Sequence, residues 1–175
     1  STLVAVLLAA GAWTTLDARV IEITAPKVNG SYLIGSAVTV GDAAEGKVAT
    51  LLQVADGKSA AAVAAAVQSY GNEWTFEAVK DKDGQFYLKA GEKYLALANA
   101  SGAADHKTAL ATVTDGDFAT AKVIPFTIDN GILKAAAIVS NGDNSVAVGD
   151  YLELVATDVP TVGANTASAT ALAYG

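Results

Sequence analysis

Apolar and polar residues alternate in three short runs between residues 74 and 98. The runs are 74–78 (WTFEA), 86–90 (FYLKA) and 94–98 (YLALA), and the third is the most uniformly apolar. The segments between them, 81–84 (DKDG) and 91–92 (GE), have the composition of tight hairpin turns. Because successive side chains of a strand point to opposite faces, this pattern predicts three antiparallel strands with one buried face.

Short alternating runs separated by Gly-, Asn- and Asp-rich turns recur along most of the remaining chain, about every 8 to 12 residues. They predict further strands at 19–24, 31–34, 37–40, 47–54, 108–113, 122–128, 132–139, 145–148 and 150–157. Pro125 places an edge strand or a bulge in one of them.

One segment, 59–70, has a different pattern. Ser59 can cap a helix, the Ala-rich body has high helix propensity, and Gly71 supplies a stop. The sequence therefore predicts an all-β fold, either a trefoil-like barrel or a β-sandwich, with one short Ala-rich helix.

Hydropathy divides the chain into an apolar segment at 1–18, a β domain at 19–159, and a small, polar linker or tail at 160–175. The uncharged run from Leu3 to Trp13 is shorter than the roughly 20 residues of a membrane-spanning helix. It matches either the apolar core of an export signal or a retained strand that docks on a neighbouring subunit. The residues of that assembly strand are Leu3, Val4, Val6, Leu7, Leu8 and Trp13.

Charge and composition exclude several classes of partner and chemistry. The 175-residue chain has a formal net charge of −7 and a single arginine, Arg19, which opposes binding to nucleic acid. It has no cysteine, so disulfides and thiolate chemistry are excluded. No run is long enough to predict a transmembrane helix.

Catalytic motifs are not apparent. His106 is the only histidine, no G-x-S-x-G elbow accompanies it, and its polar surroundings predict a solvated loop. One histidine without cysteine also removes the usual zinc ligand sets. No pair stands out among the 18 acidic residues. The sequence predicts that the protein is not an enzyme.

Three acidic or amide-rich turns, at 81–84, 115–117 and 141–144, could donate oxygens to Ca²⁺. None has the later glutamate of an EF-hand, and hairpin turns explain them equally well. The prediction is therefore no cofactor, with Ca²⁺ as the alternative. Asn29 and Asn99 begin N-glycosylation sequons, which otherwise read as plain turns.

Aromatic residues at strand positions could form a sugar-stacking face, although such residues also serve as core or cross-strand pairs. The candidate face consists of Tyr32, Trp74, Tyr87, Tyr94 and Tyr151.

An Ala-rich segment at 59–66 leads into 74–78 and then into 86–97 (FYLKAGEKYLAL), and 126–135 (FTIDNGILKA) echoes this pattern. With the N-terminal apolar run, this layout resembles that of secreted repeat-module proteins of Bacteroidales. It is also similar to ricin-B-like trefoil repeats, without their sugar-binding Gln-x-Trp signature. The resemblance implies a pseudo-symmetric β module and no catalytic residues.

These observations predict a secreted or cell-surface, non-catalytic module. It would act in adhesion, or in self-assembly as a filament or layer subunit, with a homopolymer formed through the N-terminal apolar segment. The alternative is a soluble monomer that binds a glycan or a host protein.

Overall fold

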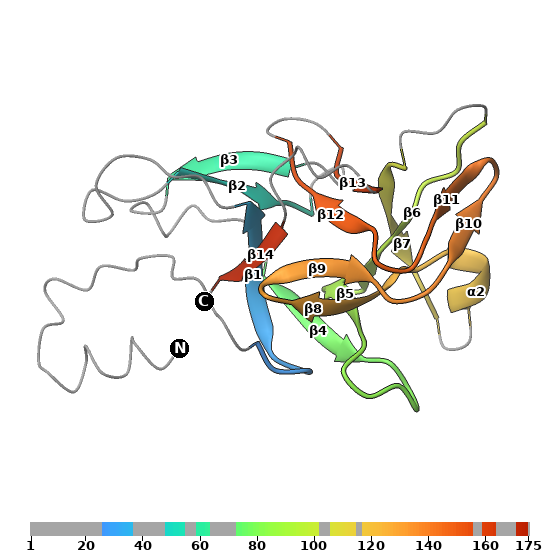
Figure 1. Cartoon of the computed structure of the whole chain (residues 1–175), viewed down its shortest axis with the longest axis horizontal. Helices are drawn as coiled ribbons and strands as arrows, with labels where there is room; N and C mark the ends of the chain where they lie inside the picture. The colour runs from blue at the N-terminus through green and yellow to red at the C-terminus, as the bar shows by residue number, and fades with distance from the viewer. Residues whose placement is uncertain are drawn as a thin grey trace, which may run out of the picture.

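The computed structural model of the protein describes residues 26–36, 48–54, 59–63, 73–101, 106–114, 117–155, 159–163 and 171–174. These residues form short β-strands and one four-residue helix (Figure 1). In chain order the elements are β1 (Ser31–Ser36), β2 (Val48–Leu52), β3 (Ser59–Val63), β4 (Trp74–Ala78), β5 (Phe86–Ala90), β6 (Lys93–Leu97), β7 (Thr108–Thr112), α2 (Phe118–Ala121), β8 (Pro125–Asp129), β9 (Ile132–Ala135), β10 (Val139–Asn141), β11 (Asn144–Val146), β12 (Tyr151–Glu153), β13 (Thr161–Gly163) and β14 (Ala171–Tyr174).

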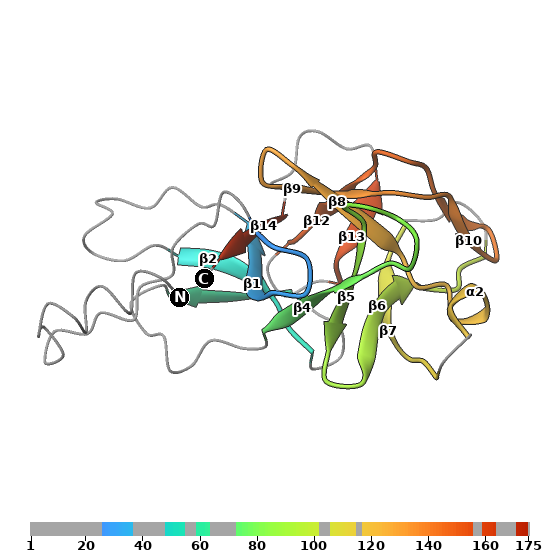
Figure 2. The same cartoon turned by 90° about the horizontal axis from the view of Figure 1, so that it is seen from below.

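The strands form a branched antiparallel sheet in the order β13-β12-β9-β8-β5-β4-β1-β2-β3. β6 branches from β5 and pairs with β7, β14 pairs with β1, and β10 and β11 make a separate ribbon. Figures 1 and 2 show β2 and β3 at the opposite end of the molecule from α2. The all-β class is confirmed. The described strands do not close into a barrel, and the trefoil layout stays a prediction.

The two predicted hairpins are confirmed. Ala78 pairs with Phe86 at the end of β4–β5, and Ala90 pairs with Lys93 across the two-residue turn between β5 and β6. Gly91, the first residue of that turn, has φ +61, a conformation that glycine adopts without steric cost.

The main core lies on one face of these hairpins. Trp74 and Phe76 of β4 and Phe86 and Leu88 of β5 are buried there, as their two-residue spacing predicts. The Trp74 indole N–H donates a hydrogen bond to the Leu52 carbonyl (3.2 Å). Burying a side chain of this size contributes roughly 1.5–3 kcal/mol, so these residues fix the register of the sheet.

The start of the predicted Ala-rich helix is a strand. All five residues of β3, Ser59–Val63, pair with β2, from Leu52↔Ser59 to Val48↔Val63. Alanine is favoured in a helix over other non-polar residue types by well under 1 kcal/mol per residue. The pairing of β3 with β2 outweighs this preference here. Residues 64–70 lie outside the described part of the chain.

The predicted tail at 160–175 contains two strands. Thr161–Gly163 pairs with β12, where Val162 is fully buried, and Ala171–Tyr174 pairs with β1 in register from Leu33↔Tyr174 to Ser36↔Ala171. Small residues do not prevent main-chain pairing, because the ladder bonds involve only backbone groups.

Pro125 does not mark an edge strand. It is the first residue of β8, which lies between β5 and β9. A proline is tolerated at the first position of a strand, where its missing N–H breaks no ladder bond. The predicted assembly strand within 1–18 and the strands at 19–24 and 37–40 lie outside the described residues.

Candidate functional site

The five aromatic residues predicted as one binding face do not share a face. Trp74 is 0% exposed and belongs to the main core, and the Tyr32 ring packs against Phe76 at the edge of this core, with 5.0 Å between ring centroids. Tyr151 lies elsewhere, beneath the Lys134 ammonium. Tyr32 and Trp74 are paired across β1 and β4 on the core side, and Tyr87 and Tyr94 come together in a separate cluster.

The period of the strands explains this separation. Glu77 of β4 pairs with Tyr87 of β5, and Lys89 of β5 pairs with Tyr94 of β6. Directly opposed residues share a face, so these four side chains lie on the face of the sheet that is opposite Trp74.

α2 completes an aromatic cluster on this second face. The Phe118 ring stacks on Tyr87 with 4.5 Å between centroids, and it meets Tyr94 edge-on at 5.1 Å. Tyr87 and Tyr94 are also perpendicular, at 6.2 Å. The buried residues Val123 and Ala96 belong to the same hydrophobic cluster as these rings. We name Tyr87, Tyr94 and Phe118 the aromatic trio.

Two charged side chains, Glu77 and Lys89, border the aromatic trio. The Tyr94 hydroxyl donates a hydrogen bond to Oε2 of Glu77 (2.7 Å). The Lys89 ammonium lies 3.5 Å from Oε1 of the same carboxylate and 5.3 Å from the centroid of the Tyr94 ring. One carboxylate and one cation therefore hold the tyrosine in place from two sides.

These surroundings raise the pKa values of three side chains. Burial raises the pKa of Tyr94 above its ordinary value of 10.0, and the hydrogen bond to Glu77 raises it further. Burial and then the Glu77 charge raise the pKa of Tyr87. A hydrogen bond with Tyr94 is the main cause that raises the pKa of Lys89. At neutral pH the two phenols are neutral and the amine is charged.

Both raised tyrosine pKa values predict a late alkaline titration. Because the folded-state pKa lies above the unfolded value of about 10, these tyrosines stabilise the fold below that pH, and the stabilisation is lost as pH rises through the folded pKa. In an ultraviolet titration of phenolate absorbance, Tyr94→Phe and Tyr87→Phe should each remove amplitude from the late part of the curve. Loss of amplitude from the early part would contradict the assignment.

A hollow of about 260 Å³ opens beside Tyr94. It lies where the β5–β6 turn meets the end of β7, since Lys93 pairs with Thr112. Its walls combine a cation, a carboxylate, hydroxyls and apolar carbon, supplied by Lys89, Glu92, Tyr94, Thr112, Val113 and Thr114. Such a mixture offers hydrogen-bond donors and acceptors beside apolar carbon.

The Lys–Tyr–carboxylate arrangement occurs a second time. Lys134 of β9 pairs directly with Tyr151 of β12, its ammonium lies 5.5 Å from the ring centroid, and it contacts the Asp129 carboxylate at 2.8 Å. Lys134 does not line the hollow, so it provides a matched control for Lys89.

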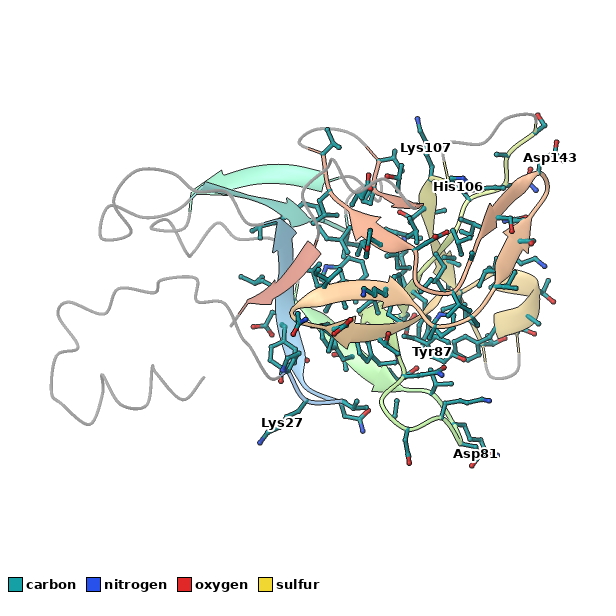
Figure 3. All side chains as sticks on the ribbon, in the orientation of Figure 1. Lys27, Asp81, Tyr87, His106, Lys107 and Asp143 are labelled. Atoms are coloured by element: carbon teal, nitrogen blue, oxygen red, sulfur yellow. The ribbon has the colours of Figure 1, made fainter. Side chains whose placement is uncertain are left out.

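His106 is not in the solvated setting that the sequence predicts. It is half-buried with φ +51, its carbonyl accepts a hydrogen bond from Val162 N–H (3.0 Å), and its Nδ1 is buried without a hydrogen-bond partner among the described residues. Figure 3 shows it beside Lys107, away from Tyr87. The pairing of Lys107 with Thr161 holds this loop against β13.

One of the turns considered for Ca²⁺, at 141–144, has a structural role. Asn141 and Asn144 donate side-chain hydrogen bonds to the carbonyls of Leu97 (2.9 Å) and Ala98 (2.8 Å). Figure 3 places Asp81 and Asp143 at the tips of separate hairpins. Within the described residues, no three His, Cys, Asp or Glu side chains gather as a metal-binding group. Residues 115 and 116 lie outside that part of the chain.

The two sequon asparagines are exposed but hydrogen-bonded. Asn29 Oδ1 accepts from Ala78 N–H (3.0 Å), and the Asn99 amide donates to Asn141 Oδ1 (3.0 Å). Both side chains fasten a loop to a neighbouring hairpin, which is a role of turn asparagines.

Sequence reasoning missed Phe118 and most of the hollow. Phe118 lies in a helix of only four residues, which is too short to show a helical period. Glu92 belongs to a turn, and Thr112 to Thr114 lie at a strand end, where hydroxyls are common. Alternation does place Glu77, Tyr87 and Lys89 on one face, and that signal was present in the sequence.

No protein-family model matches this chain, and no curated protein and no solved structure is detectably similar to it. Among the described residues, no helix has the length and apolar character needed to cross a membrane.

Proposed function

We propose that this domain is a non-catalytic recognition module that binds a sugar unit of a glycan in the hollow beside Tyr94. The observation that carries the proposal is the hollow itself, which is lined by Lys89, Glu92, Tyr94, Thr112, Val113 and Thr114. An exported, cell-surface setting belongs to the same proposal.

A neutral polyhydroxyl ligand fits this chemistry. Lys89 and Glu92 carry opposite charges, so the hollow presents a strong donor and a strong acceptor without a large excess of either charge. Tyr94 is only 6% exposed and already fixed by Glu77, so it serves as a rigid wall. A site fixed before binding loses little conformational entropy when the ligand enters.

Binding is favoured over catalysis because Tyr94 and Lys89 keep their protons at neutral pH. General acid–base chemistry needs a pKa near the working pH. The pKa values of Tyr94 and Lys89 are both raised, and hence lie further from neutrality than usual.

The proposal is tested by titrating the full chain with glucose, galactose, mannose and N-acetylglucosamine, with glucuronic acid as a charged comparison. Amide chemical shifts and calorimetry are the measurements. At least one neutral sugar should shift the amides of 89–94 and 112–114. Lys89→Ala should weaken its binding by about tenfold, since a hydrogen bond to a charged group is worth about 1.5–3 kcal/mol.

Lys134→Ala is the control, because it removes the same contact from the second Lys–Tyr–carboxylate arrangement, outside the hollow. It should leave sugar affinity unchanged. Equal losses in the two variants, or shifts confined to residues far from the hollow, would contradict the site. If glucuronic acid is the one sugar that binds, the ligand of the hollow is an anionic sugar and not a neutral one.

A further inference from the structure

Among the described residues, the ribbon formed by β2 and β3 has one side with no paired strand. β3 pairs along its whole length with β2, whereas β1 reaches β2 only at Thr50 and Leu51. The described part of the chain places no strand against the other side of β3. Figures 1 and 2 show the ribbon at the opposite end of the described residues from α2.

β3 lacks the features that protect edge strands. Natural edges carry charged residues, prolines or bulges that discourage another chain from pairing, whereas β3 reads Ser-Ala-Ala-Ala-Val. The strand β13, which ends the other side of the sheet, is covered. Its Val162 N–H donates to the His106 carbonyl (3.0 Å), its Thr161 pairs with Lys107, and the preceding Pro160 carbonyl accepts from Thr108 N–H (2.9 Å). Within the part of the chain that the structure describes, β3 is an uncharged strand with one unpaired edge, and such an edge selects an extended, uncharged partner.

The chain itself contains such a segment. Residues 3–8 (LVAVLL) have no charge and no proline, and six extended residues match the five residues of β3 in length. The net charge of −7 repels one copy from another, so contact is favoured where both surfaces are uncharged. We propose that the outer edge of β3 accepts residues 3–8 of a second copy of this chain as an added strand.

This interface is independent of the sugar site, which lies on β5 to β7. It predicts concentration-dependent association of the chain that begins at Ser1, with the start verified by intact mass. Sedimentation velocity over a wide concentration range measures the association. Val6→Asp charges the added strand and Ala61→Asp charges the accepting edge. Each should weaken association by at least about tenfold, because a buried unpaired charge costs well over 1.4 kcal/mol.

Ala119→Asp makes the same chemical change at an exposed position of α2 and should associate like the unmodified chain. A chain that sediments as a monomer at every concentration overturns the proposal. So does association that Val6→Asp weakens and a folded Ala61→Asp does not, because the apolar segment would then bind elsewhere.

A second measurement covers the case in which Ala61→Asp fails to fold. A peptide of residues 1–13 is added to the full-length Val6→Asp chain, and amide hydrogen exchange is followed. Exchange at 59–63 should slow when the peptide binds, because the added strand protects outward N–H groups of β3. Unchanged exchange at 59–63 overturns the proposal, and sugar binding measured on the same sample is unaffected by either result.

Discussion

Trp74→Ala should lower the free energy of unfolding by about 3 to 5 kcal/mol, the range for deleting a large buried aromatic side chain. Trp74 is 0% exposed, and its removal empties space next to Phe76 and Leu88 in the main core. It also leaves the Leu52 carbonyl without its indole donor. That hydrogen bond connects β4 to the end of β2, so the substitution should loosen the ribbon end as well.

Urea unfolding followed by far-ultraviolet circular dichroism measures this change. Trp74→Phe keeps most of the apolar contact but removes the hydrogen bond, and it should cost about 1 to 3 kcal/mol. Ile138→Ala is the matched surface control. Ile138 is 72% exposed, and its substitution should change stability by no more than about 0.5 kcal/mol. A Trp74→Ala effect no larger than that of Ile138→Ala would show that this core is not the one that stabilises the fold.

The strands around Trp74 were predictable because two local signals agree there. Alternation in 74–78 and 86–90 fixes which side chains are buried, and the 91–92 turn fixes the register of β5 with β6. The same alternation separates Trp74 from Tyr87, which lie on opposite faces. Grouping the aromatic residues by type ignored this period, and it therefore combined core and surface rings in one predicted face.

Other parts of the structure carry no strong local signal. The residues of β3 favour a helix by propensity, and only the pairing with β2, which is tertiary, makes them a strand. The hollow is likewise non-local, since β5, β6 and the end of β7 meet there only after the sheet has formed. Single-residue propensities contain no information on such contacts.

The attachment of the β10–β11 ribbon depends on Gly142. This residue has φ +65, and a Cβ at this position would collide with the carbonyl oxygen of Ala100. Two hydrogen bonds join the segments at this close approach. Asp143 N–H donates to the Ala100 carbonyl (2.7 Å), and Ala100 N–H donates to the Asn141 carbonyl (3.4 Å). Neither the strain nor the clash can be relieved by moving a flexible side chain, since the opposing atom belongs to the backbone.

Gly142→Ala should therefore lower the free energy of unfolding by about 2 to 5 kcal/mol, of which the left-handed conformation contributes about 1–2 and the steric clash the rest.

Gly91→Ala is the control, because Gly91 has nearly the same φ, +61, with no atom within 4 Å of an added Cβ. It should cost only the conformational part, about 1–2 kcal/mol. The difference between the two variants measures the contact with Ala100. Asn141 and Asn144 donate to the Leu97 and Ala98 carbonyls at the end of β6, and Asn144 also donates to the Lys107 carbonyl just before β7 (3.3 Å). Gly142→Ala should therefore also speed hydrogen exchange in β6 and β7, whereas Gly91→Ala should not. Equal costs for the two substitutions would mean that the ribbon moves away from Ala100 without loss, and that it does not fasten this end of the sheet.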